Sequence, residues 1–119
     1  MSDTIFEIVG AGRKPIPHHE RHKERIFIGS AVLQYGKRIG CDTAKELCRR
    51  TRISAPIISA LIGGREHNSI TVGIMQRVAV VISCDLRLTD EAEEHFDVIP
   101  STMEELFNIG IVPRFIPRQ

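Results

Sequence analysis

Two helix starts and one helix stop lie close together in the middle of this chain, and they limit how it can fold. Thr43 begins the sequence TAKE, a capping box in which the threonine oxygen accepts an amide N–H and Glu46 reaches back to the threonine amide. Ser54 supplies a second cap, followed by a proline in the first turn, where a missing N–H costs little. Gly63 and Gly64 stop that helix, because glycine enters the left-handed cap conformation without steric penalty. The spacing predicts two short helices joined by a tight turn.

Apolar residues at helical spacing predict further helices on both sides of this pair. An upstream stripe predicts a first helix over about residues 24 to 38, since its members recur at steps of three or four. The stripe consists of Ile28, Val32, Tyr35 and Ile39. Downstream, Thr71 or Ser69 is expected to cap a helix through VGIMQRVAVVISC that is apolar beyond one face. Such a pattern is typical of a central buried helix or of a dimer contact.

The flanking segments divide the chain into three parts. Residues 1 to 25 combine a β-prone run, TIFEIV, with a charged stretch that contains proline, which predicts an extended N-terminal arm. Residues 26 to 88 hold the helices described above. Residues 89 to 119 are predicted to add a helix at TDEAEEHF, a second capping box from Ser101 and an extended tail, GIVPRFIPRQ. This tail could form a short edge strand and pair with TIFEIV, within the chain or across a dimer. Residues 89 to 119 could in this way form the dimer contact, away from DNA.

The composition is that of an ordinary globular domain. The 119 residues are 42% hydrophobic and 26% charged, which is enough to bury a core without disulfides. The longest apolar run, VAVVIS, is too short to cross a bilayer, and no leader precedes it, so we expect a cytoplasmic protein without membrane contact. Cys41, Cys48 and Cys84 form no CxxC pair, so each is interpreted as a small buried apolar residue.

A net charge of +1 hides a strong asymmetry along the chain. Between Arg13 and Arg65 there are twelve Lys or Arg residues against four acidic ones. From Asp85 to Glu105 there are eight acidic residues against Arg87 alone. One part of the molecule is therefore suited to a polyanion and another would repel one, although two solvated faces would give the same pattern.

The segment TAKELCRRTRISAPIISALIGGRE resembles the helix-turn-helix of the lambda-repressor-like family, also called the XRE family, which includes phage repressors and Cro proteins. The matching positions are Leu47-Cys48 for the family's Leu-Ala, Ile53-Ser54 for Val-Ser, Ile58 in mid-helix, and Gly64-Arg65 for the frequent Gly-Lys. Arg52 departs from the family, because it stands where glycine is usual and must accept a positive φ or a different turn. The resemblance covers roughly residues 26 to 88 and implies an all-α fold, a compact bundle of about five helices with an extended arm and a C-terminal extension.

The resemblance further implies a DNA-binding transcriptional regulator of the repressor type, a homodimer that docks the helix of residues 54 to 62 in the major groove. By position, its DNA-contacting residues are Thr43, Ala44, Arg52, Ser54, Ala55, Pro56, Ser59, Ala60 and Arg65. In the arm, Arg21, Lys23 and Arg25 are expected to reach the DNA backbone or minor groove. The docking helix lacks Arg, Lys, Asn and Gln, so specificity would depend on methyl contacts, DNA shape and dimer spacing.

A module that binds a partner protein is the alternative. Ile57 and Ile62 would then add apolar surface to the same helix, because exposed apolar patches mark contacts. An antitoxin-like regulator that binds both DNA and protein lies between these hypotheses. An enzyme is not expected, since the sequence contains no glycine-rich phosphate loop, nucleophile-histidine arrangement or carboxylate pocket. The histidines of PHHERH match no metal-ligand spacing, so neither a metal nor a cofactor is expected.

Overall fold

The computed structural model describes residues 15–88 and 101–118, and within them the chain is mostly helical. The helices are α2 (His18–Lys37), α3 (Ala44–Thr51), α4 (Ala55–Gly63), α5 (Val72–Val81) and α7 (Met103–Asn108). Two strands, β1 (Cys84–Arg87) and β2 (Arg114–Pro117), pair antiparallel with Leu86 opposite Phe115. None of these helices combines the length and the apolar character needed to cross a bilayer. The prediction of a mainly helical domain is confirmed, and the strand in the C-terminal tail agrees with the short edge strand expected there, whereas β1 was not expected.

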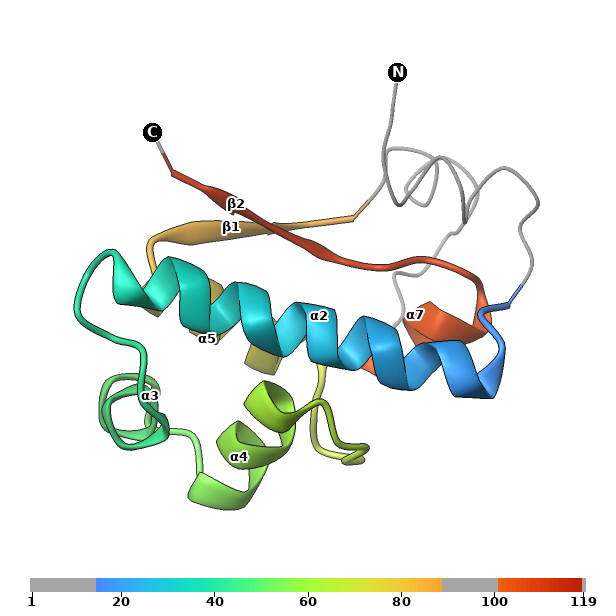
Figure 1. The fold of residues 1–119 in the computed structure, drawn as a ribbon, viewed down its shortest axis with the longest axis horizontal. Helices are drawn as coiled ribbons and strands as arrows, with labels where there is room; N and C mark the ends of the chain where they lie inside the picture. Colours follow the sequence, from blue (N-terminus) through green and yellow to red (C-terminus); the bar gives the residue numbers. More distant parts are fainter. Residues whose placement is uncertain (1–14, 89–100, 119) are drawn as a thin grey trace.

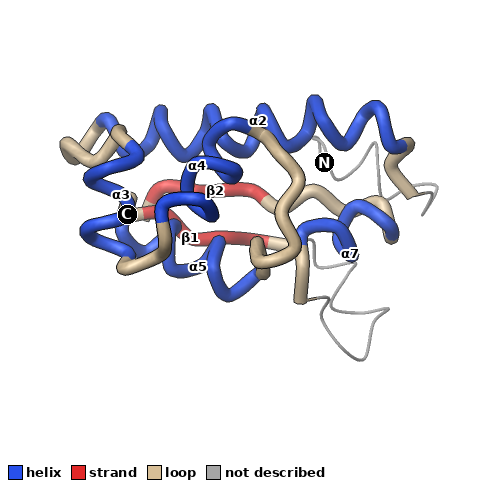
Figure 2. The backbone as a smooth tube through the Cα atoms, turned by 90° about the horizontal axis from the view of Figure 1, so that it is seen from below, coloured by secondary structure: helices blue, strands red, loops and turns tan. Residues whose placement is uncertain are grey.

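The strand pair and the two short helices lie on opposite sides of the domain. In Figure 1, β1 and β2 lie above α2 and α5, whereas α3 and α4 lie below α2. Seen from below in Figure 2, β2 lies toward α2, β1 lies toward α5, and α4 lies in front of the sheet. The largest fully buried side chains between these layers include Phe107, Ile28, Leu47, Ile58, Met75 and Ile82.

Threonine side chains cap three of the helices. The pairs of threonine oxygen and amide nitrogen, each 3.1 Å apart, are Thr43 with Glu46, Thr71 with Ile74, and Thr102 with Glu105. Each bond satisfies one of the free N–H groups of a first helical turn. The predicted starts at Thr43 and Thr71 are confirmed. The start predicted at Ser101 is displaced by one residue, because it is Thr102 that adopts the extended cap conformation.

Close packing at two glycines fixes α4 against α2. A Cβ on Gly29 would lie 2.5 Å from the carbonyl oxygen of Ile62, so the backbones of α2 and α4 approach at this point. Gly64 ends α4 with φ of 70°, and a Cβ there would lie 2.6 Å from Cγ1 of Ile26. Any larger residue at these positions would push the two helices apart.

Two arginines expected in the arm belong instead to α2, which begins at His18 rather than near residue 24. The prediction of an extended arm over residues 1 to 25 is therefore wrong for residues 18 to 25; residues 1 to 14 lie outside the described part of the chain. Arg25 is buried and donates to Glu104 of α7 at 2.6 Å, with its guanidinium 5.9 Å from the centre of the Phe107 ring. Arg21 donates to Glu104 and to Asn108. Both arginines therefore attach α7 to α2 and do not belong to an extended arm.

The C-terminal tail forms a strand, but its partner differs from the predicted one. β2 pairs with β1, which begins at Cys84, the last residue of the helix predicted over VGIMQRVAVVISC. Helix α5 ends at Val81, and Ser83 takes φ of 59°, which turns the chain into β1. The expected strand TIFEIV and the expected helix TDEAEEHF lie outside the described residues.

Two of the three cysteines are buried as predicted. Cys41 and Cys84 are buried and Cys48 is half-buried, and all three are free thiols. Burial raises the pKa of Cys41 and of Cys84 above the ordinary thiol value. Both therefore remain protonated at neutral pH and act as packing residues.

We expect Arg25→Ala to lower the free energy of unfolding by about 2–3 kcal/mol, because it removes a buried side chain and the short ion pair to Glu104. Lys23→Ala is the matched control, since the Lys23 side chain is 72% exposed, and it should change stability by less than about 0.5 kcal/mol. Urea unfolding followed by circular dichroism measures both. Equal small effects of the two substitutions would contradict the role assigned to Arg25.

Candidate nucleic-acid interface

A three-residue turn joins α3 to α4. α3 ends at Thr51, and Arg52 adopts the left-handed conformation with φ of 60° and ψ of 29° while its amide donates to the Cys48 carbonyl at 2.9 Å. The expectation that Arg52 accepts a positive φ is confirmed. Ser54 then precedes α4 as its cap residue in extended conformation, although its hydroxyl makes no capping hydrogen bond.

Hydrogen bonds from side chains of α3 and α5 hold this turn in place. The buried hydroxyl of Thr51 donates to the Leu47 carbonyl at 2.6 Å and accepts the amide of Ile53 at 3.2 Å. The guanidinium of Arg77, on α5, donates to the carbonyl oxygen of Thr51. Because α3, the turn and α5 share these bonds, α4 begins at a defined place relative to the core.

Most of the residues predicted to contact DNA lie at the surface around this turn. Exposed residues are Thr43, Arg52, Ser54, Ala55, Pro56 and Arg65, while Ala44 and Ser59 are half-buried. The prediction for Ala60 is wrong, because this residue is only 3% exposed and belongs to the core. Helix α4 packs against α2 on one side and α3 on the other, so more than one of its faces is covered. Its exposed face is consequently narrow and consists of small side chains.

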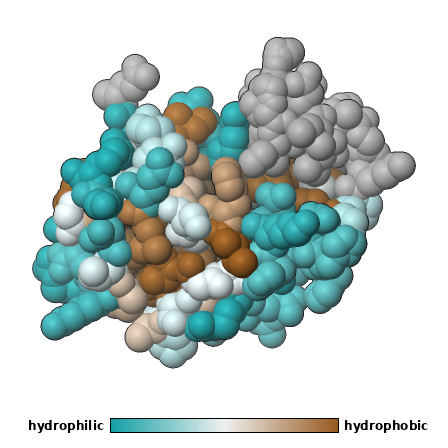
Figure 3. Space-filling view, viewed as in Figure 1, coloured by the Kyte–Doolittle hydropathy of each residue, from teal (hydrophilic) through white to brown (hydrophobic). Residues whose placement is uncertain are grey.

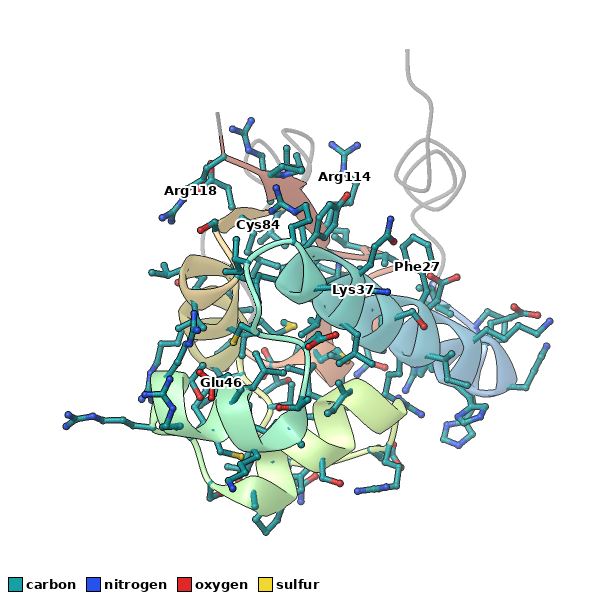
Figure 4. All side chains as sticks on the ribbon, turned by 60° about the vertical axis from the view of Figure 1, so that its left-hand side comes forward. Phe27, Lys37, Glu46, Cys84, Arg114 and Arg118 are labelled. Atoms are coloured by element: carbon teal, nitrogen blue, oxygen red, sulfur yellow. The ribbon has the colours of Figure 1, made fainter. Side chains whose placement is uncertain are left out.

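Basic side chains border this narrow face. Five Lys or Arg residues lie between positions 43 and 65 against Glu46 alone, and they are Lys45, Arg49, Arg50, Arg52 and Arg65. Arg65 donates to the Ser59 hydroxyl at 2.8 Å, which lays its guanidinium along α4. Glu46 accepts hydrogen bonds from Arg49 and from Arg50, the latter at 2.8 Å. Figure 4 shows Glu46 on α3, at the opposite side of the domain from Arg114 and Arg118 near the strand pair.

The predicted capping box at Thr43 is half formed. Thr43 accepts the amide of Glu46, but the Glu46 carboxylate turns to the two arginines one turn further along α3. Hydrogen bonds from Arg49 and Arg50 lower the pKa of Glu46 from its ordinary value of 4.5 to about 2. The carboxylate is therefore charged at neutral pH and offsets part of the positive charge of α3.

The apolar residues of α4 do not form the exposed patch that the partner-protein hypothesis requires. Ile57 and Ile62 are half-buried and pack against the core. The large apolar side chains that are exposed lie on α2 and α5: Ile26 at 43%, Phe27 at 51% and Val80 at 55%. Figure 3 shows an apolar area across the middle of the face seen in Figure 1. The exposed Ile26 and Phe27 lie in a stretch, Ile26 to Gly36, that contains no charged residue, and this is a signal that the sequence carries.

Of the three basic residues expected in the arm, Lys23 alone is exposed; Arg25 is buried and Arg21 is half-buried. Lys23 lies 3.5 Å from the carboxylate of Glu20 on the same helix. Within residues 15–88 and 101–118, no group of three His, Cys, Asp or Glu side chains is placed to hold a metal ion.

The chain matches no protein-family model, no curated protein and no solved structure. The surface formed by α3, the turn and the exposed face of α4 is thus assigned from the geometry, burial and charge of its own residues. We call this surface the α4 face.

We expect Arg52→Gly to raise the free energy of unfolding by up to about 1 kcal/mol, because glycine adopts the left-handed conformation without the Cβ clash that an L residue incurs. Urea unfolding of the two proteins tests this. The Arg50→Gly control should lower stability by about 1 kcal/mol, since Arg50 lies inside α3. A loss of stability in Arg52→Gly would mean that contacts of the Arg52 side chain outweigh the backbone strain.

We expect the carboxyl carbon of Glu46 to titrate near pH 2 in an NMR pH series, and near its ordinary value of 4.5 when Arg49 and Arg50 are both alanine. Because the pKa is lowered in the folded state, the ion pairs contribute stability above about pH 4.5 and lose it as the pH falls toward 2. An unchanged titration in the double variant would show that these arginines do not set the pKa.

Proposed function

We propose that this protein is a DNA-binding transcriptional regulator that places α4 in the major groove. The observation that carries the proposal is the α4 face itself: a short helix fixed after a three-residue turn, with a narrow exposed side and basic residues along its border. A major groove about 12 Å wide admits one helix of this kind. The resemblance of TAKELCRRTRISAPIISALIGGRE to the lambda-repressor-like helix-turn-helix supports the same assignment.

Backbone strain at Arg52 supports a role for its side chain. A non-glycine residue in the left-handed region costs roughly 1–2 kcal/mol, and such residues cluster at functional sites. Arg52 occupies this conformation at the exposed corner between α3 and α4, where a positive charge faces solvent. We assign Arg52 to a phosphate contact.

Under this proposal, different elements supply the charge that attracts DNA and the small side chains that contact its bases. Helix α4 itself contains no charged residue, so the attraction to DNA comes from α3, the turn and Arg65. Ala55, Pro56 and Ser59 are small, which lets the α4 backbone approach base edges and thymine methyl groups closely. Affinity in this arrangement is mainly electrostatic and salt-dependent, and sequence preference comes from methyl contacts and DNA shape.

A homodimer on a palindromic site completes the proposal. Two α4 helices spaced about 34 Å apart would enter successive major grooves on one side of the duplex. The charge distribution favours DNA on the α4 side, because the basic residues of α3 and the turn lie there, whereas the exposed Glu105 lies on α7, away from α3.

We expect duplex DNA to bind with an affinity that falls as salt rises, measured by fluorescence anisotropy at two or more salt concentrations on genomic fragments. Arg52→Ala and Arg65→Ala should each reduce the slope of log affinity against log salt by about 0.9, the contribution of one phosphate contact.

Arg87→Ala is the matched control for this titration. Arg87 is a 59% exposed arginine on the strand pair, on the side opposite α4, and its removal should leave the slope unchanged. Absence of salt-dependent binding to any fragment would refute the proposed function. An equal reduction of the slope in all three variants would show that binding depends on total charge and not on the α4 face.

A further inference from the structure

Within residues 15–88 and 101–118, one edge of the strand pair presents backbone groups without a hydrogen-bond partner. The amide of Arg118 donates to the Ser83 carbonyl at 3.0 Å, which fixes the alternation of hydrogen-bonded and non-bonded pairs along β1 and β2. By this alternation the N–H and C=O groups of Asp85 and Arg87 point toward β2. Those of Cys84 and Leu86 point the other way, toward the side of α5.

The opposite edge, on β2, is a poor site for another strand. By the same alternation the residues of β2 that point away from β1 are Phe115 and Pro117, with Pro113 preceding them. Proline has no N–H to donate, so this edge offers the amide of Phe115 alone. An extended segment can therefore add to the pair through β1 and not through β2.

A groove runs beside the open edge of β1. It has a volume of about 600 Å³ and lies between α5 and β1, with Val72, Ala79, Val80, Leu86 and Leu88 among its apolar lining residues. Val80 is 55% exposed there, the largest value among the exposed large apolar side chains of the described residues. Asp85, Arg87 and Arg118 lie along the same groove. A strand beside β1 would thus have apolar side chains of α5 beneath it and charged side chains beside it.

We propose that residues 4–9, TIFEIV, bind in this groove as a third strand, parallel to β1. The run has the length and the β-branched and aromatic composition of a short strand. The strands of the described residues 15–88 and 101–118 are β1 and β2, and this run is not among them. This inference is independent of DNA binding and concerns a different side of the molecule.

The chain length between TIFEIV and the described domain is sufficient. The amide of Ile16 donates to the Phe107 carbonyl at the end of α7, and the amide of Val72 donates to the Ser101 carbonyl at its beginning. The six residues of α7 rise about 9 Å, whereas residues 10–14 span up to about 17 Å when extended. The α7 end of the groove is therefore within reach of the segment.

The same connection sets the direction of the added strand. In Figure 1, β1 runs from the α3 end toward the α7 end, and the described chain also begins beside α7. TIFEIV must end near α7 to join it, so it runs in the direction of β1.

The sequence of TIFEIV determines which side faces the groove. Side chains alternate along a strand, so Phe6 and Ile8 share one face and Glu7 lies on the other. A carboxylate against the apolar side of α5 would be costly, which places Phe6 and Ile8 beneath and Glu7 on the outer face. Arg87 lies on the outer face of β1, where it can pair with Glu7 across the strands.

Hydrogen exchange measured by NMR on the full chain tests this placement. In the parent protein the Leu86 amide should exchange at least about tenfold more slowly than in Phe6→Asp/Ile8→Asp, because that double variant cannot occupy the groove. The Asp85 and Arg87 amides, which bond to β2, should change little and report that the domain stays folded. Ile5→Asp/Val9→Asp is the matched control, with outward-facing positions, and should retain most of the protection.

A charge exchange provides a second measurement that does not alter the apolar face. Glu7→Arg and Arg87→Glu should each speed exchange of the Leu86 amide, and the combined variant should restore slow exchange. Fast exchange of Leu86 in the parent protein would overturn the proposal, as would protection that survives Phe6→Asp/Ile8→Asp. Protection that disappears on dilution would assign the groove to a second copy of the chain, which also overturns it. None of these readouts involves DNA, so their failure is distinct from failure of the proposed function.

Discussion

The start of α4 depends on the turn that precedes it, and one buried hydroxyl group holds that turn. Thr51 donates to Leu47 within α3 and accepts the amide of Ile53 in the turn, and Arg77 of α5 donates to the Thr51 carbonyl. These bonds satisfy backbone groups at the end of α3 that would otherwise be buried without partners. They also leave the Ser54 hydroxyl uncommitted, because the start of α4 is fixed without it. Because these bonds involve α3, the turn and α5, they leave the exposed face of α4 available to a ligand.

Local signals predicted the starts of α3, α4 and α5 well, because capping is decided within one helical turn. Thr43, Thr71 and Gly64 occupy predicted cap positions, and the positive φ of Arg52 is one of the two alternatives that its place in the turn left open. The role of Arg25 could not be found in this way. Its partner Glu104 lies 79 residues further along the chain, and a charged stretch beside proline resembles a solvated arm until α7 is placed.

The composition of the candidate site was predictable, but the burial of its members was not. Helix α4 is apolar around most of its circumference, so the sequence does not reveal which sides are covered. Because both α2 and α3 pack on it, Ala60 enters the core, and Ile57 and Ile62 are half-buried. The exposed remainder is smaller and less apolar than the sequence suggested, which weakens the argument for a protein partner at this face.

The absence of long polar side chains on α4 is consistent with DNA binding once charge and contact are assigned to different elements. Arg49, Arg50 and Arg52 lie on α3 and the turn, where they can approach phosphates on the edge of a groove. A face of Ala55, Pro56 and Ser59 lacks the bidentate contacts that discriminate bases by about 1–3 kcal/mol each. Under the proposed function, affinity would come mainly from contacts to the DNA backbone, and sites would be distinguished by DNA shape and by the spacing of two copies. Specificity under this proposal then depends on how rigidly the hydrogen bonds of Thr51 hold the start of α4.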